Sequence, residues 1–131
     1  MPTVISTNKQ LIDFGKEDVV IRNYVDGIKG GKVLDVDGFT DDVISAGHLI
    51  IKTSAGSYKP MPVAVSGDAY GTLPGDCEYA GVLVSSVLTS EPFAAIMFSG
   101  EVNEKAGPYP ITAEIKTALK TAMPTLVFNH D

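Results

Sequence analysis

The sequence predicts a mainly β fold, an antiparallel β-sandwich or a small β-barrel-like sheet, with one α-helix near the C-terminus. Three observations lead to this prediction. Short runs rich in β-branched and aromatic residues alternate with glycine and proline turns along the 131 residues. Two of these runs, 79–88 and 93–102, are strongly apolar and flank a short polar turn. Helical periodicity is convincing in one segment, which follows Pro110.

The strands are predicted in order from residue 19. Residues 19–25, 32–36 and 48–53 carry strand-forming residues, and glycine-containing turns or an aspartate-rich loop separate them. The next run, 58–65, contains Pro60 and Pro62, which cannot donate to a ladder, so we expect an edge or irregular strand there. The runs 79–88 and 93–102 are predicted to form an antiparallel hairpin at the centre of the core.

The C-terminal helix has recognisable ends. Thr112 is the predicted N-cap, and Pro124 is expected to stop the helix after Met123. An apolar stripe follows helical spacing and comprises Ile115, Ala118, Leu119 and Ala122. Residues 125–128 are then expected to return as a final strand.

Length and composition indicate one globular domain at 19–131, preceded by a flexible N-terminal arm at 1–18. Hydrophobic residues make up 44% of the chain and charged residues 20%. The net charge of −6 disfavours a nucleic-acid partner. The longest fully apolar run, 93–98, is too short to span a bilayer, so no membrane association is expected.

The arm carries isolated apolar residues that could contact a partner. These candidate contact residues are Val4, Ile5, Leu11, Ile12 and Phe14. The alternative is that they form an ordinary strand packed on the domain's own core.

Catalytic and metal-binding patterns are weak. Cys77 and His48 could form a nucleophilic pair, but no local motif supports it, and both are interpreted as structural residues. The aspartate-rich loop 35–42 does not fit a calcium-binding loop, because Gly38 and Ala46 stand at the fourth and twelfth positions from Asp35. The loop is interpreted as a solvated turn, and we expect no enzyme activity, no metal site and no cofactor.

The C-terminal half resembles the head decoration and head-fibre proteins of tailed bacteriophages. The resemblance rests on the strand GVLV at 81–84, the strand FAAIMFSGEV at 93–102, the helix TAEIKTALK at 112–120 after Pro110-Ile111, and the terminal LVF at 126–128. The segment GHLI at 47–50, followed by YKP at 58–60, is also similar to these proteins. The similarity extends over roughly residues 30–128.

This resemblance implies a noncatalytic structural virion protein that binds the outer surface of a phage or prophage head. The implied partner is the major capsid protein, and the implied assembly is a homotrimer, at least on the capsid. The protein would be located in the host cytoplasm before assembly and on the capsid surface of the virion afterwards. In decoration proteins an N-terminal arm often becomes ordered by adding a strand to the capsid, a role that residues 1–18 would suit. The chain has no long fibrous extension, which favours a decoration module over a fibre shaft.

An alternative hypothesis is that the chain is a small ligand-binding or carbohydrate-binding β module. Its site could use the aromatic side chains of Tyr58, Tyr70, Tyr79 or Tyr109. The third hypothesis is that the chain is a small enzyme that uses Cys77 or His48.

Overall fold

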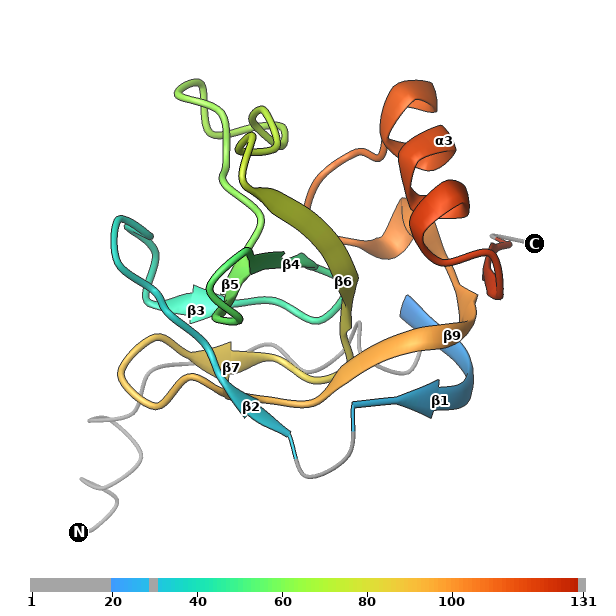
Figure 1. Cartoon of the computed structure of the whole chain (residues 1–131), viewed down its shortest axis with the longest axis horizontal. Coiled ribbons are helices and arrows are strands. Elements are labelled where there is room, and N and C mark those ends of the chain that lie inside the picture. The colour runs from blue at the N-terminus through green and yellow to red at the C-terminus, as the bar shows by residue number, and fades with distance from the viewer. Residues whose placement is uncertain (1–19, 29–30, 130–131) are drawn as a thin grey trace, which may run out of the picture.

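The computed structural model of the chain describes residues 20–28 and 31–129, and its main feature is one open β-sheet (Figure 1). The strands follow the order β1 (Ile21–Gly27), β9 (Ile96–Val102), β6 (Cys77–Leu83), β4 (Leu49–Thr53) and β5 (Tyr58–Pro60), with β10 (Leu126–Phe128) also paired to β9. The neighbours in this order are antiparallel, whereas β10 runs parallel to β9. The prediction of a mainly antiparallel β fold with a C-terminal helix is confirmed.

The sheet does not close into a barrel, so the barrel-like form of the prediction is wrong. β1 and β5 lie at the two ends of the strand order, and these strands do not pair with each other in the described ranges. Pro60 ends β5 and has no N–H to donate, which agrees with the expected edge position.

Two short ribbons accompany the sheet. One pairs β2 (Lys32–Val33) with β8 (Phe93–Ala94), and the other pairs β3 (Val43–Ile44) with β7 (Val87–Leu88). The predicted hairpin is therefore confirmed at its base, where Val82 lies opposite Met97 in antiparallel β6 and β9. Beyond this base the two arms pair with different N-terminal segments, and they meet again at the tip in a bridge between Leu88 and Glu91.

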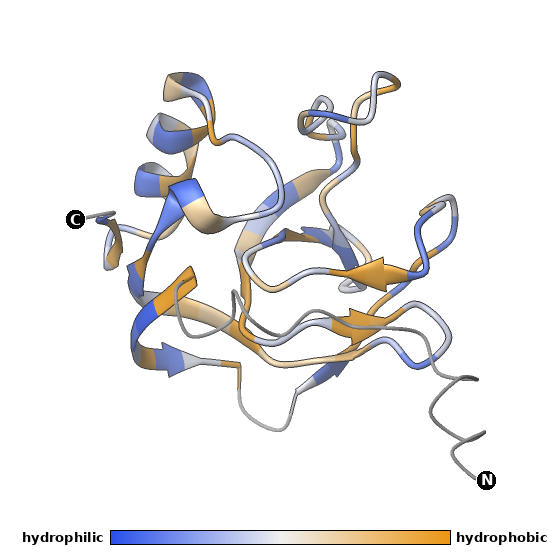
Figure 2. Ribbon diagram, turned by 180° about the vertical axis from the view of Figure 1, so that it is seen from behind, coloured by the Kyte–Doolittle hydropathy of each residue, from blue (hydrophilic) through white to orange (hydrophobic). Residues whose placement is uncertain are grey.

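Each face of the sheet has its own core, because successive side chains in a strand point to opposite faces. In β4, Leu49 and Ile51 belong to the core beneath the helix, whereas Ile50 belongs to the core beneath the ribbons. In β6, Val82 belongs to the core beneath the helix and Leu83 to the core beneath the ribbons. Figure 2 shows the corresponding mixture of hydrophilic and hydrophobic residues along the helix, which covers one of these cores.

The helix α3 (Ala113–Ala122) begins and ends where the sequence predicts. The Thr112 hydroxyl accepts a hydrogen bond from the Ile115 N–H at 3.3 Å, which confirms the N-cap. Leu119 is fully buried, but Ala122 is exposed and Met123 is buried in its place. The apolar stripe is thus wrong at its last position, because the backbone leaves helical geometry at Met123 and turns that side chain into the core.

Replacing Thr112 with alanine is expected to lower the free energy of unfolding by about 1 kcal/mol, because the Ile115 N–H loses its capping acceptor. Urea denaturation followed by circular dichroism measures this loss. The matched control is Thr117→Ala, an exposed threonine inside α3 whose removal should change the stability by less than about 0.5 kcal/mol. Equal losses in the two variants would contradict the capping role.

Candidate functional site

A cleft of about 390 Å³ lies where three distant segments of the chain meet. The aspartate-rich loop supplies one wall of the cleft, and the segment from Lys59 to Gly67 supplies a second. Tyr109, from a third segment, completes the lining. The Asp35 N–H donates to the Tyr58 carbonyl at 2.8 Å, which attaches the aspartate-rich loop to β5. A β-bridge between Val63 and Tyr70 holds the second wall.

Two aromatic side chains belong to the lining of this cleft, and we call them its floor. Phe39 and Tyr109 line it, and both rings meet the buried His48 imidazole edge-on, with centroids 5.5 Å and 5.7 Å away. Tyr70 completes the cluster at 5.2 Å from both His48 and Tyr109. His48 Nε2 donates to the Met61 carbonyl at 2.9 Å, so the imidazole that supports the two lining rings is itself held in place.

The cluster is uncharged at neutral pH. Burial lowers the pKa of His48 to about 4, against the smaller opposing effects of the Met61 carbonyl and Asp41. Burial also raises the pKa of Tyr70. The pKa of Tyr109 is raised by burial first and then by the charge of Asp41, whose carboxylate accepts a hydrogen bond from the Tyr109 hydroxyl. The floor is therefore apolar with a polar edge at Asp41.

Charged groups stand around the floor. Asp35, Asp37 and Asp41 are exposed and line the cleft with the half-buried Lys59. The Asp37 N–H donates to the Asp35 carboxylate at 3.1 Å, the contact typical of a solvated aspartate turn. Within the described part of the chain, no group of three or more His, Cys, Asp or Glu side chains could hold a metal ion.

Of the four tyrosines proposed for a binding module, Tyr70 has Tyr109 and Tyr79 as neighbours, whereas Tyr58 packs on the other core. Tyr109 lines the cleft and Tyr70 lies beneath it. Tyr58 lies on β5, with the ammonium groups of Lys32 and Lys52 at 5.8 Å and 5.6 Å from its ring centroid. Tyr79 lies half-buried in β6 and does not line this cleft, but it lines a second hollow of about 310 Å³ together with Tyr70.

The structure does not bring Cys77 and His48 together. Cys77 lies opposite Thr53 at one end of β4, whereas His48 precedes Leu49 at the other end. The pKa of the Cys77 thiol is raised by partial burial and by the neighbouring Asp76, which disfavours the reactive thiolate. The five apolar arm residues, Val4, Ile5, Leu11, Ile12 and Phe14, lie outside the described residues.

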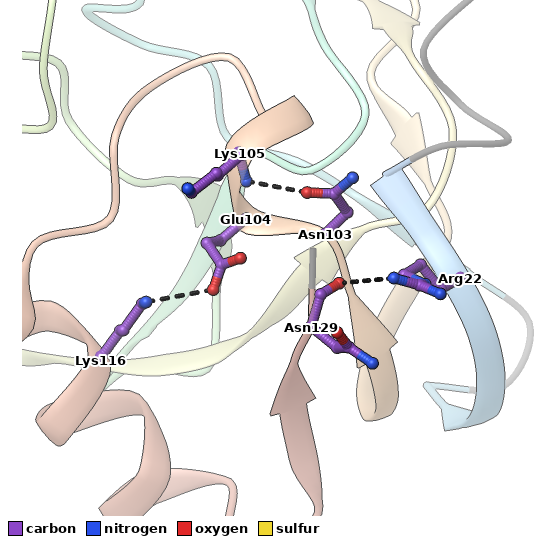
Figure 3. Close-up of polar contacts among 6 residues, drawn as sticks. All are labelled: Arg22, Asn103, Glu104, Lys105, Lys116 and Asn129. Atoms are coloured by element: carbon purple, nitrogen blue, oxygen red, sulfur yellow. Dashed lines mark hydrogen bonds and ion pairs between the residues drawn. The ribbon is translucent and has the colours of Figure 1, made fainter. Parts of the chain in front are cut away.

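The sequence did not predict a set of polar side-chain contacts near α3, β1 and β10 (Figure 3). The buried Glu104 carboxylate pairs with the Lys116 ammonium of α3 at 3.1 Å. Arg22 of β1 donates to the Asn129 carbonyl beyond β10 at 3.3 Å and also pairs with Glu101 of β9. These contacts connect α3, β1 and β10 to the segment around β9, and they are structural.

Comparisons of the chain with protein-family models, with curated proteins and with solved structures found no match. In the part of the chain that the structure describes, no helix has the length and apolar character needed to cross a membrane.

Proposed function

We propose that this chain is a noncatalytic structural protein of a phage or prophage head that binds the outer surface of the shell through the major capsid protein. The observation that carries the proposal is the exposure of β1 and its unpaired outer edge. Its residues 22–26 are exposed on both faces of the strand, and no strand of the described ranges pairs with its outer edge. The register of β1 on β9 shifts at three places, so the regular part of the edge is short, and we propose that a short strand of another chain adds there.

Apolar exposure on the same strand supports this proposal. Tyr24 and Val25 are 53% and 61% exposed, although both have the character of core residues. The arm at 1–18, with its five candidate contact residues, ends two residues before this strand begins. An arm and an edge strand that follow one another can engage one partner together.

We further propose that copies associate as homotrimers on the shell. Val33 of β2 lies opposite Phe93 of β8, and the two side chains are 67% and 61% exposed. A pair of neighbouring exposed apolar side chains offers a contact that a second copy can cover.

The copy number of the chain in virus particles tests the head assignment. Quantitative mass spectrometry of purified particles, produced by a strain that encodes the chain, is expected to give a constant ratio to the major capsid protein. A ratio of one copy per capsid subunit or per capsomer is the expected result. Particles that lack the chain would overturn the proposal.

Deleting residues 1–18 is expected to leave the domain folded and to weaken attachment to the shell at least about tenfold, because the apolar arm residues no longer contribute burial. Co-sedimentation with shells that lack the protein measures attachment, and circular dichroism verifies the fold. The control keeps the arm and replaces its polar residues Lys9 and Gln10 with alanine. Unchanged attachment of the deleted chain would contradict the role of the arm.

A further inference from the structure

We propose that the cleft over Phe39 and Tyr109 binds a neutral saccharide. No residue that lines this cleft belongs to β1 or to residues 1–18, so the inference does not depend on the proposed attachment to a capsid. Three properties of the cleft carry it: a fixed apolar floor, hydrogen-bonding groups around that floor, and the balance of charge.

The two side chains of the floor are held in place without a ligand. Phe39 and Tyr109 are half-buried, and both pack on the same buried imidazole of His48, which is fixed by its hydrogen bond to Met61. Pro60 and Pro62 add rigid apolar surface to the lining. Little side-chain entropy remains to be lost on binding, and the C–H face of a sugar ring is the kind of flat apolar surface that such a floor accepts.

The surrounding groups match the hydroxyls of a sugar. The carboxylates of Asp35, Asp37 and Asp41 are acceptors for hydroxyl donors, and the Lys59 ammonium is a donor for hydroxyl or ring oxygens. Asp41 is also fixed by the hydrogen bond it accepts from Tyr109, which leaves further lone pairs of the same carboxylate for a ligand. Each ligand hydroxyl can thus meet a charged partner while the ring covers the floor.

The charge of the lining selects among ligands. Three aspartates stand against one lysine, so a sialylated or sulfated glycan meets net repulsion. A lysine-rich peptide segment would gain from the carboxylates but would place its charge near Lys59, and its side chains offer no flat apolar face for the floor. A neutral saccharide satisfies both kinds of charged group, and the volume of about 390 Å³ lies in the range of small-molecule sites.

The test exposes the full chain to an array of neutral, sialylated and sulfated oligosaccharides, followed by calorimetric titration of the best neutral glycan. We expect saturable binding to neutral glycans that Asp41→Asn weakens at least about tenfold, because a charged acceptor is lost. The matched control is Asp42→Asn, because Asp42 is the exposed neighbour of Asp41 and does not line the cleft. Tyr109→Phe keeps the aromatic ring and removes the hydroxyl that holds Asp41, so we expect an intermediate loss.

Three results would overturn the proposal: no saturable binding to any neutral glycan, equal affinity of the Asp41 and Asp42 variants, or binding confined to acidic glycans. An oligolysine peptide is titrated in parallel, and its binding without that of a neutral glycan would assign the cleft to cationic segments instead. The copy number of the chain in virus particles is measured separately. Failure of the saccharide site therefore leaves the capsid proposal intact, and the reverse also holds.

Discussion

Replacing Gly100 with alanine is expected to lower the free energy of unfolding by about 3–4 kcal/mol. Gly100 has a φ of 149°, in the region that favours glycine, and it pairs with Tyr24 of β1 on one side and with Leu126 of β10 on the other. A β-carbon there would collide with the Asn23 carbonyl oxygen and would lie 2.8 Å from the Met97 sulfur. Because the first of these atoms is backbone, β1 must move away from β9.

A comparison with a substitution at Gly56 distinguishes the cost of the steric collision from the cost of backbone strain. Gly56 also has a positive φ, 95°, but a β-carbon at this position would meet no atom within 4 Å. Gly56→Ala should therefore cost only the strain, about 1–2 kcal/mol. Urea denaturation gives both losses, and hydrogen exchange of the β1 amides shows whether the extra loss in Gly100→Ala comes from release of this strand. Equal losses would contradict the collision.

Release of β1 also connects stability to the proposed function. If the outer edge of β1 receives a strand from the capsid, a displaced β1 offers a poorer template. The Gly100 variant should then attach to shells more weakly than the Gly56 variant at a temperature at which both remain folded. This comparison tests the strand edge without removing the arm.

Features that depend on neighbouring residues could be predicted from the sequence. Thr112 caps α3 and Pro124 follows its end, because capping and the missing proline N–H are local effects. The edge position of the Pro60 strand follows from the same missing donor. The central antiparallel pair was also predictable, since 79–88 and 93–102 are adjacent apolar runs.

Features that depend on distant segments could not be predicted in the same way. The β10 strand lies parallel to β9 because α3 crosses between them, and no local signal in 125–128 distinguishes this from antiparallel pairing. The expected strand 32–36 is reduced to Lys32–Val33, because the Asp35 N–H donates to the Tyr58 carbonyl of β5 and so leaves the ladder with β8. An open sheet and a closed barrel have the same alternation along each strand, so the pattern could not separate them.

The cleft shows the same limit at the level of single residues. Tyr109 was a candidate because it is aromatic, but its position beside Phe39 and Asp41 results from the meeting of three segments. His48 was interpreted as structural, and its burial and its bond to Met61 agree with that interpretation. The sequence did not indicate that this histidine supports the two lining rings.

The stability of the protein is expected to fall by about 3 kcal/mol between pH 6.5 and pH 4, because of His48. Burial lowers its pKa from 6.5 to about 4 in the folded state. Below pH 6.5 the unfolded chain binds a proton at this residue while the folded chain does not, so unfolding becomes more favourable as the pH falls. Below about pH 4 both states are protonated at His48, and its contribution stops changing.

The variant His48→Gln separates this effect from the titration of carboxylates, because it keeps a donor for the Met61 carbonyl and does not titrate. Among the groups around His48, Asp41 partly opposes the shift by its negative charge, and Tyr70 and Tyr109 remain neutral throughout this pH range. Urea denaturation at several pH values should give a steeper loss for the original chain than for the variant. An NMR titration of the His48 imidazole in the unmodified protein supplies an independent measurement should the variant fold poorly. Parallel stability curves, or an imidazole that titrates near pH 6.5, would contradict a neutral His48 as the support of the cleft floor.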